Sequence, residues 1–222
     1  MDIPFIDIHT HHPVYSEEIR SVSNLFLQEV NLQINKNTPF SAAIHPWHAA
    51  QFAPAQVSTM LENLTNLPGL IAIGETGLDK ACTADYQLQK LLFELHLGFA
   101  EKHHIPLIIH AVKSWNELIV YLKRAKVPFI FHGFSGGIEL TKQLIDLGAY
   151  FSVGKSALRI TPRFREAIRI IPLASLFLET DDSFADIREI YHEVAKVREI
   201  SMEELKIQIN RNYINLFLND RN

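Results

Sequence analysis

The stretch LIAIGETGLD at positions 70–79 sets a pattern that recurs along the chain. It begins with a mainly apolar run, Leu70–Gly74. The polar residues that come after this run are Glu75, Thr76 and Asp79. A short apolar run of this kind is typical of a strand buried on both faces of a parallel sheet. The polar residues would then lie at the carboxyl end of the strand, where α/β folds place their functional groups.

Seven more runs resemble this one, and longer amphipathic stretches separate most of them, as in parallel βα units. The eight predicted strands are Ile3–Ile8, Asn24–Glu29, Phe40–Ile44, Leu70–Gly74, Pro106–His110, Val127–His132, Ala149–Val153 and Ser175–Glu179. The predicted helices are Pro54–Asn66, Ala84–His104, Ser114–Ala125, Ile138–Leu147, Pro162–Ile170, Asp186–Ile200 and Met202–Leu218.

Eight strands with intervening helices predict an α/β fold, a (β/α)8 TIM-type barrel. The connections His12–Ser23 and Val30–Pro39 are too short for full outer helices, so the early helices of the barrel would be abbreviated. An open doubly wound sheet is the competing architecture, but no Gly-rich phosphate loop follows the first strand.

Composition places the chain among globular proteins, and no linker or low-complexity segment divides it, which predicts one domain over residues 1–222. Its 222 residues are 47% hydrophobic, enough for a sizeable core.

The single cysteine, Cys82, and the absence of a signal-peptide pattern predict a cytoplasmic protein without a membrane span. A net charge of −4 is unlike that of proteins with a broad basic face for duplex DNA. It gives no sign of an obligate protein partner.

Six imidazole and carboxylate groups lie at or just after predicted strand ends, and we expect them to hold divalent metal. They are His9, His11, Glu75, His110, His132 and Asp181. Residues two apart on a strand point to the same side, so His9 and His11 can face one ion. Six ligands exceed the need of one tetrahedral zinc and suggest two adjacent ions that share a carboxylate.

Each of these residues has an ordinary structural alternative. His110 can be a hydrogen-bonded core histidine, Glu75 a helix cap, and Asp181 an N-cap for a helix near Ser183. Their joint occurrence at several strand ends favours the metal site, because burying so many ionisable groups without a ligand is costly.

Five motifs in this order resemble the TatD-like metal-dependent deoxyribonucleases, of the amidohydrolase type. The motifs are DIHTH at 7–11, IHP at 44–46, GETGLD at 74–79, HGFSG at 132–136 and LETD at 178–181, with a helix pattern at Gln89, Phe93, Leu97 and Ala100 and the closing Asn212, Leu216 and Phe217. The resemblance spans nearly the whole chain.

The resemblance implies two divalent ions (Mg, Mn or Zn), with His9, His11 and Asp181 at one, His110 and His132 at the other, and Glu75 as the bridge. It implies hydrolysis of DNA phosphodiesters, often at a 3′ end, by a water whose pKa the metals lower. Asp181 and Glu75 would be the catalytic residues, Asp181 orienting the water and accepting its proton. Asp7 and Asp79 would fix their neighbours.

The same resemblance implies substrate binding by His45, Lys113 and Ser135. The family usually carries an arginine two residues after the histidine of the fifth strand, where this chain has Val112 and then Lys113. Ser183 stands where a proline is common. Both changes affect the substrate-binding rim.

Other residues near the strand ends have both functional and structural interpretations. Trp47, between His45 and His48, could stack on a base or simply pack a loop. In the basic stretch after the seventh strand, Lys155 and Arg159 lie nearest the strand end and could steer phosphates. We expect no role in the site for His12, His96, His103 or His104.

Three functions fit the sequence. The first is a deoxyribonuclease acting on single strands or ends of a DNA substrate. The second is a hydrolase of a smaller ester or amide on the same barrel, such as an aminoacyl-tRNA deacylase. The third, a non-catalytic interaction protein, is disfavoured because all six ligand positions are filled.

Overall fold

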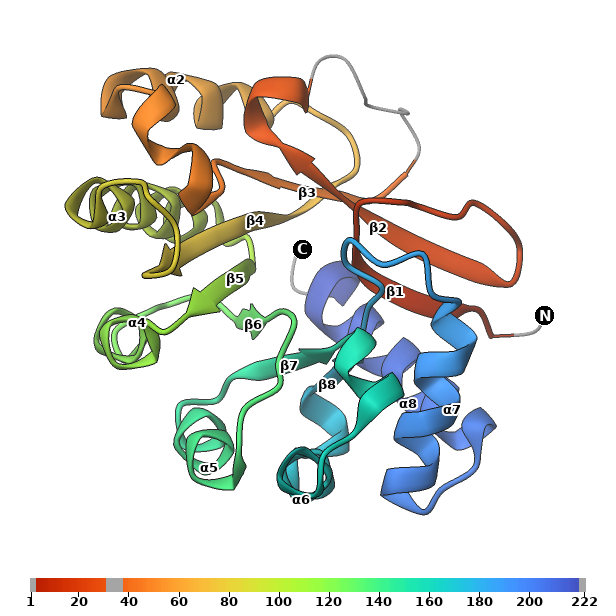
Figure 1. Cartoon of the computed structure of the whole chain (residues 1–222). Helices are drawn as coiled ribbons and strands as arrows, with labels where there is room; N and C mark the ends of the chain where they lie inside the picture. Colours follow the sequence, from red (N-terminus) through yellow and green to blue (C-terminus); the bar gives the residue numbers. More distant parts are fainter. Residues whose placement is uncertain (1–2, 31–37, 220–222) are drawn as a thin grey trace. The chain divides into compact units, whose positions relative to one another are not determined.

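The computed structural model describes residues 3–30 and 38–219 and contains all eight predicted strands (Figure 1). The strands are β1 (Phe5–Thr10), β2 (Ile19–Phe26), β3 (Phe40–Ala43), β4 (Leu70–Asp79), β5 (Leu107–Val112), β6 (Phe129–Phe131), β7 (Tyr150–Val153) and β8 (Leu176–Leu178). They follow one another in sequence order in an eight-stranded sheet. A doubly wound sheet reverses its strand order at a switch point, so this order confirms the predicted (β/α)8 barrel topology.

Seven α-helices occupy the predicted stretches, with ends shifted by a few residues at most. They are α2 (Pro54–Leu64), α3 (Tyr86–His103), α4 (Trp115–Leu122), α5 (Ile138–Asp146), α6 (Pro162–Ile170), α7 (Ile187–Arg198) and α8 (Met202–Ile214). The described residues also contain short helical turns: η1 (Leu27–Glu29), η2 (Pro46–Gln51), η3 (Lys155–Arg159), η4 (Leu173–Ser175) and the π-helical η5 (Asn215–Asn219). None of the helices in the described residues has the length and apolar character needed to cross a membrane.

The second strand is the one whose predicted position was wrong. It was expected at Asn24–Glu29 but runs over Ile19–Phe26, and Leu27–Glu29 form a helical turn. Its sequence IRSVSNLF hides the strand because three polar residues, Ser21, Ser23 and Asn24, are buried within it. No helix lies between β1 and β2, as expected, whereas residues 31–37 of the other short connection lie outside the described residues.

The described residues form two compact units. One contains the chain up to Ser23 and from Phe131 onward, and the other contains Asn24–Ile130. Within the first unit, Thr10 of β1 forms a parallel bridge with Asp181, just after β8. The first strand therefore lies beside the end of the last strand, as closure of a barrel requires.

Helices α7 and α8 pack on β1 and β8 in the first unit. The buried Tyr191 hydroxyl accepts a hydrogen bond from Ile6 N at 3.0 Å and donates one to Ile6 O at 3.1 Å. Asn212 Nδ2 donates to the carbonyls of Leu173 and Leu176 at 2.7 and 2.9 Å. These bonds fix the strands that carry the polar residues of this unit.

In the second unit, β4 is paired in parallel with β3 and β5. The strand continues beyond the predicted end at Gly74 and includes the whole GETGLD motif. Gly77 has a φ of +151°, and a Cβ at this position would lie 2.0 Å from the His110 carbonyl oxygen. Only glycine allows β4 and β5 to approach so closely beside Glu75.

Candidate metal centre

His9, His11 and Asp181 come together in the first unit. His9 is buried in β1, and His11 follows that strand. The Nε2 atoms of His9 and His11 lie 3.6 and 4.0 Å from Asp181 Oδ1, and the three side chains offer ligand atoms within 4.8 Å of one another. The period-two spacing of the histidines on a strand thus brings both rings to one carboxylate.

Main-chain hydrogen bonds hold these three residues in register. Asp181 N donates to His9 O, and His11 N donates to Asp181 O, each at 2.9 Å. Asp181 itself has a φ of +56°, a conformation that aspartate tolerates better than most residues. The three side chains are therefore positioned by the backbone of adjacent strand ends.

His132 joins the same cluster from the end of β6. Its ring centroid lies 4.5 Å from that of His9. Its Nδ1 lies 3.5 Å from Oε1 of Glu179, which is fully buried. The backbone N–H of Gly133 donates to the same oxygen at 2.5 Å. This carboxylate orients the loop and the ring of His132.

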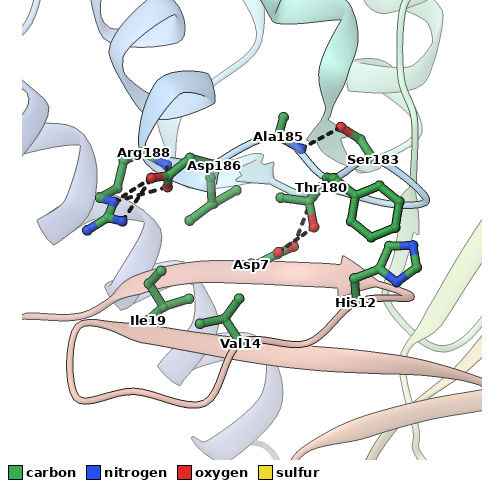
Figure 2. Close-up of a pocket in the computed structure, with 11 residues that line it drawn as sticks. Asp7, His12, Val14, Ile19, Thr180, Ser183, Ala185, Asp186 and Arg188 are labelled. Atoms are coloured by element: carbon green, nitrogen blue, oxygen red, sulfur yellow. Dashed lines mark hydrogen bonds and ion pairs between the residues drawn. The ribbon is translucent and has the colours of Figure 1, made fainter.

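Asp7 lies beneath the cluster and binds the loop that contains Asp181. Its Oδ1 accepts from Thr180 N at 3.0 Å, and its Oδ2 accepts from Thr180 Oγ1 at 2.6 Å (Figure 2). Burial raises the pKa of Asp7 to about 7, although these hydrogen bonds oppose the shift. Asp7 thus positions its neighbours, the kind of role the sequence predicted for it.

Glu75 is the centre of a second polar cluster, in the second unit. His45 Nε2 and His110 Nδ1 lie 3.1 and 2.5 Å from Glu75 Oε1. Asn24 Nδ2 donates to Glu75 Oε2 at 3.4 Å. Glu75, His45 and His110 are all buried and offer ligand atoms within 4.8 Å of one another.

The hydrogen bonds of His45 define its orientation toward Glu75. Its Nδ1 accepts a hydrogen bond from Trp47 N at 3.2 Å. In a neutral imidazole, Nε2 then carries the proton and donates it to Glu75. His45 was predicted to bind substrate; the structure places it, buried, against Glu75.

Asp79 supports His110 from the opposite side. Its Oδ2 lies 3.3 Å from His110 Nε2 and accepts from Trp47 Nε1 at 2.7 Å. Burial raises the pKa of Asp79, but hydrogen bonds from Trp47, Ala81 and His110 more than offset this and lower it overall. These contacts give the predicted supporting role of Asp79 a structural basis. Trp47 is 59% exposed, and its indole nitrogen anchors the ring to Asp79.

Lys113 and Ser135, the other two residues predicted to bind substrate, are exposed. Lys113 directly follows β5 and is exposed, with a φ of +53°. Ser135 is exposed in the loop after His132. Lys155 forms an ion pair with Asp182, and that hydrogen bond raises its pKa. His96, expected to lie outside the site, is buried, and its Nε2 accepts from Ile44 N at 3.0 Å.

Sequence reasoning missed the contacts of Glu179 and Asn24. Glu179 is two residues before Asp181, so a strand would turn both side chains to one side, and this spacing was an available signal. Asn24 could not be recognised because the second strand was placed too late. In the structure it lies near the carboxyl end of β2 rather than at its start.

The donor sets fit divalent metal. In the first unit, His9 and His11 offer ligand atoms close to Asp181, and His132 and Glu179 form a further donor group with the same Asp181. The buried Glu179 Oε2 has no hydrogen-bond partner among the described residues. Mixed nitrogen and oxygen ligands suit Zn and Mn. The bridging role of Glu75 and the sharing of one ion by His110 and His132 stay predictions.

Comparison with known proteins identifies the family. The family model described as TatD related DNase matches residues 6–218. The chain belongs to this family. It is 30% identical over 152 residues to an Escherichia coli protein named uncharacterized metal-dependent hydrolase YjjV, and 29% identical over 163 residues to a Schizosaccharomyces pombe protein named Deoxyribonuclease Tat-D. The matches cover 64% and 67% of this chain. The predicted class of metal-dependent hydrolase is thus confirmed at the level of the TatD family.

The matched regions span 58% of the length of the YjjV protein and 52% of that of the Schizosaccharomyces pombe protein. Among solved structures, the Escherichia coli YjjV TatD homologue has a TM-score of 0.80 at 22% identity, with 98% of this chain and 99% of that chain covered. A TatD family hydrolase from Entamoeba histolytica has a TM-score of 0.77 at 17% identity, with coverage of 98% and 99%. These likenesses show the fold that this TatD-family chain shares with them.

Proposed function

We propose that this TatD-family chain is a deoxyribonuclease that uses two divalent ions to cleave phosphodiester bonds at single-stranded ends, as a 3′ exonuclease does. The observation that carries the proposal is that His9, His11 and His132 all offer ring nitrogens close to the Asp181 carboxylate. The second unit has a donor cluster of its own, in which His45 and His110 lie close to the Glu75 carboxylate. A cytoplasmic setting, in which Cys82 stays reduced, suits this role.

Divalent ions held by these residues would supply Lewis acidity, which lowers the pKa of water and stabilises negative charge on the phosphoryl group. His9, His11 and Asp181 would hold one ion, and His110 and His132 would hold the other. Asp181, whose side chain is 23% exposed, would orient the attacking water and accept its proton. Glu179 and Asp79 keep the rings of His132 and His110 in place.

The choice of DNA as substrate rests on the family and on the net charge of the chain. The family description and the name of the Schizosaccharomyces pombe relative both specify deoxyribonuclease activity for those proteins. A chain with a net charge of −4 suits a substrate that is held mainly by metal ions rather than by a basic face.

The direct test is to incubate the purified protein with 5′-labelled single-stranded DNA and Mg²⁺ or Mn²⁺, with and without EDTA. We expect stepwise shortening from the 3′ end that EDTA abolishes. Asp181→Asn should lower kcat by at least about 100-fold, since a positioned general base contributes 10²–10⁴-fold. Metal-dependent turnover of esters or amides without any DNA cleavage would refute the nuclease assignment.

Metal binding can be tested separately from activity. Mn²⁺ should raise the melting temperature of the wild type, because a ligand that binds the native state stabilises it. His9→Ala should weaken this shift, whereas His192→Ala, at an exposed position of α7, should not. Equal shifts for wild type and His9→Ala would remove His9 from the metal site.

A second candidate is hydrolysis of a smaller ester or amide, such as deacylation of charged tRNA. The observation that favours it is the altered rim, where Lys113 is displaced by one residue from the position of the usual family arginine and Ser183 replaces proline. A water activated by two metals can attack a carbonyl carbon as well as phosphorus. A panel of aminoacyl esters assayed beside DNA distinguishes the two candidates.

A further inference from the structure

Two rings from separate loops stack at the rim of the first unit, beside Asp181. The His12 and Phe184 rings have centroids 4.1 Å apart and an interplanar angle of 19°. Phe184 is nonetheless 87% exposed, the most exposed of the large hydrophobic residues described. The Phe184 ring stacks on His12, and most of the Phe184 side chain stays accessible to a further planar group.

The ring pair is next to the candidate metal ligands in the chain and in the fold. His12 directly follows His11, and Phe184 comes three residues after Asp181. The backbone hydrogen bonds between Asp181 and the residues of the first strand end hold the two loops together. A group that stacks on Phe184 would therefore belong to the part of a substrate adjoining the reacting bond.

A pocket of about 260 Å³ lies beside the ring pair, and both rings line it (Figure 2). Its apolar walls are Val14, Ile19, Ala185 and Ile187. Pockets that bind drug-sized molecules have volumes of roughly 300–1,000 Å³. The pocket beside the ring pair is smaller, so it suits a single planar ring rather than a larger molecule.

The charges around the pocket select against an anion. Of the two acidic residues that line it, Asp186 presents its carboxylate, whereas the carboxyl group of Asp7 is buried and bound by Thr180. Arg188 is the cation at the rim, but its guanidinium is bound by Asp186 at 2.9 and 3.0 Å and by Glu18 at 3.1 Å. A neutral ring is therefore favoured here over a phosphate.

Hydrogen bonds fix both loops in place before any ligand binds. His12 N donates to Thr10 Oγ1 at 3.1 Å, and Val14 N donates to Ser21 Oγ at 3.1 Å. In the other loop, Ala185 N donates to Ser183 Oγ at 3.0 Å. A surface ordered in advance loses less entropy when a ligand stacks on it.

We propose that the His12–Phe184 ring pair is the stacking platform for the nucleobase that adjoins the scissile phosphate. This inference rests on the proposed function and names the part of the substrate that the rim recognises. Stacking on an aromatic ring accepts any base, so the platform gives preference for an unpaired nucleotide without sequence preference.

The test compares single-stranded oligonucleotides that carry a normal base or an abasic residue at each of the last two 3′ positions. With the wild type, one abasic substitution should lower kcat/KM by at least about fivefold, mainly through KM, the loss expected for one base–aromatic stack. Phe184→Ala should lower kcat/KM for the normal oligonucleotide to a similar degree and remove the discrimination. Phe184→Tyr should restore both.

Tyr15→Ala is the matched control, because Tyr15 is a neighbouring aromatic residue, 55% exposed, that does not line the pocket. It should retain the discrimination of the wild type. The platform would be refuted if the wild type cleaved normal and abasic substrates at equal rates, or if Phe184→Ala and Tyr15→Ala had equal effects. Either result would leave the nuclease assignment intact. Failure of the wild type to cleave any DNA would refute both.

Discussion

The Nδ1 atom of His132 lies 3.5 Å from Oε1 of Glu179, a carboxylate with no exposed surface. That oxygen also accepts the Gly133 backbone N–H, so one buried group orients both the ring and the loop that carries it. Gly154 adds a packing constraint, because a Cβ there would lie 3.2 Å from Glu179 Cγ. A buried carboxylate beside a histidine fixes which ring nitrogen is presented to a metal.

Glu179→Gln should weaken metal binding without unfolding the protein. The amide keeps the shape of the side chain but loses the charge that makes His132 a stronger ligand, and such changes typically cost 10–100-fold in metal affinity. Titration with Mn²⁺, followed by calorimetry, measures the change. Glu139→Gln, at an exposed position in α5, is the control and should bind as the wild type does. An unchanged affinity for Glu179→Gln would mean that its carboxylate serves only the Gly133 loop.

Thr180→Val should destabilise the protein by about 1–3 kcal/mol, because it leaves Asp7 buried without its 2.6 Å hydroxyl partner. Urea unfolding in EDTA provides the free energy of unfolding. Thr59→Val serves as the control, since the Thr59 side chain is exposed and its hydroxyl donates to the Ala55 carbonyl within the same helix. Its effect should stay within about 0.5 kcal/mol. Similar losses for the two variants would show that the Asp7–Thr180 pair contributes little.

Gly77→Ala should prevent folding or destabilise the protein by several kcal/mol, because the new Cβ would lie 2.0 Å from the His110 carbonyl oxygen. Gly98→Ala is the matched control. Gly98 lies in α3 with nothing within 4 Å of its potential Cβ, so alanine should stabilise the helix by about 0.5–1 kcal/mol. Thermal unfolding followed by circular dichroism should shift in opposite directions for the two variants. A folded Gly77→Ala protein of wild-type stability would contradict the close approach of β4 and β5.

His96 should make stability depend on pH between about 4 and 6.5. Burial lowers the pKa of His96 to about 4 in the folded state, although its hydrogen bond with Leu92 O opposes the shift. The unfolded chain therefore binds more protons in this window, and stability falls as the pH is lowered through it, by at most roughly 3 kcal/mol. Above about pH 6.5 the contribution is fully present.

Urea unfolding of wild type and His96→Gln at pH 7 and pH 4.5, both in EDTA, tests this sign. The variant should lose less stability than the wild type between the two pH values, because it has no imidazole to protonate on unfolding. A steeper loss for His96→Gln would contradict the assignment of a neutral, buried His96.

The sequence could predict those features that depend on local periodicity and on residue type. Apolar runs predicted seven strands at nearly their observed positions, and the helices α2 to α8 begin within two residues of their predicted starts. The strand β2 was misplaced because its buried Ser21, Ser23 and Asn24 break the apolar run. Their burial is possible only because partners elsewhere in the fold satisfy them, as when Ser41 Oγ donates to Asn24 Oδ1 at 3.2 Å.

By itself, the sequence determined the order of the elements, the family and the identity of the candidate ligands, because a period of two on strands and motifs at strand ends are local properties. The tertiary structure alone decided further contacts around those ligands. Glu179 reaches His132 across 47 residues of chain, and the Phe184 ring stacks on His12 from a different loop. Contacts of this kind depend on which strand ends become neighbours and on the direction of each side chain, and neither follows from the residues next to them in sequence.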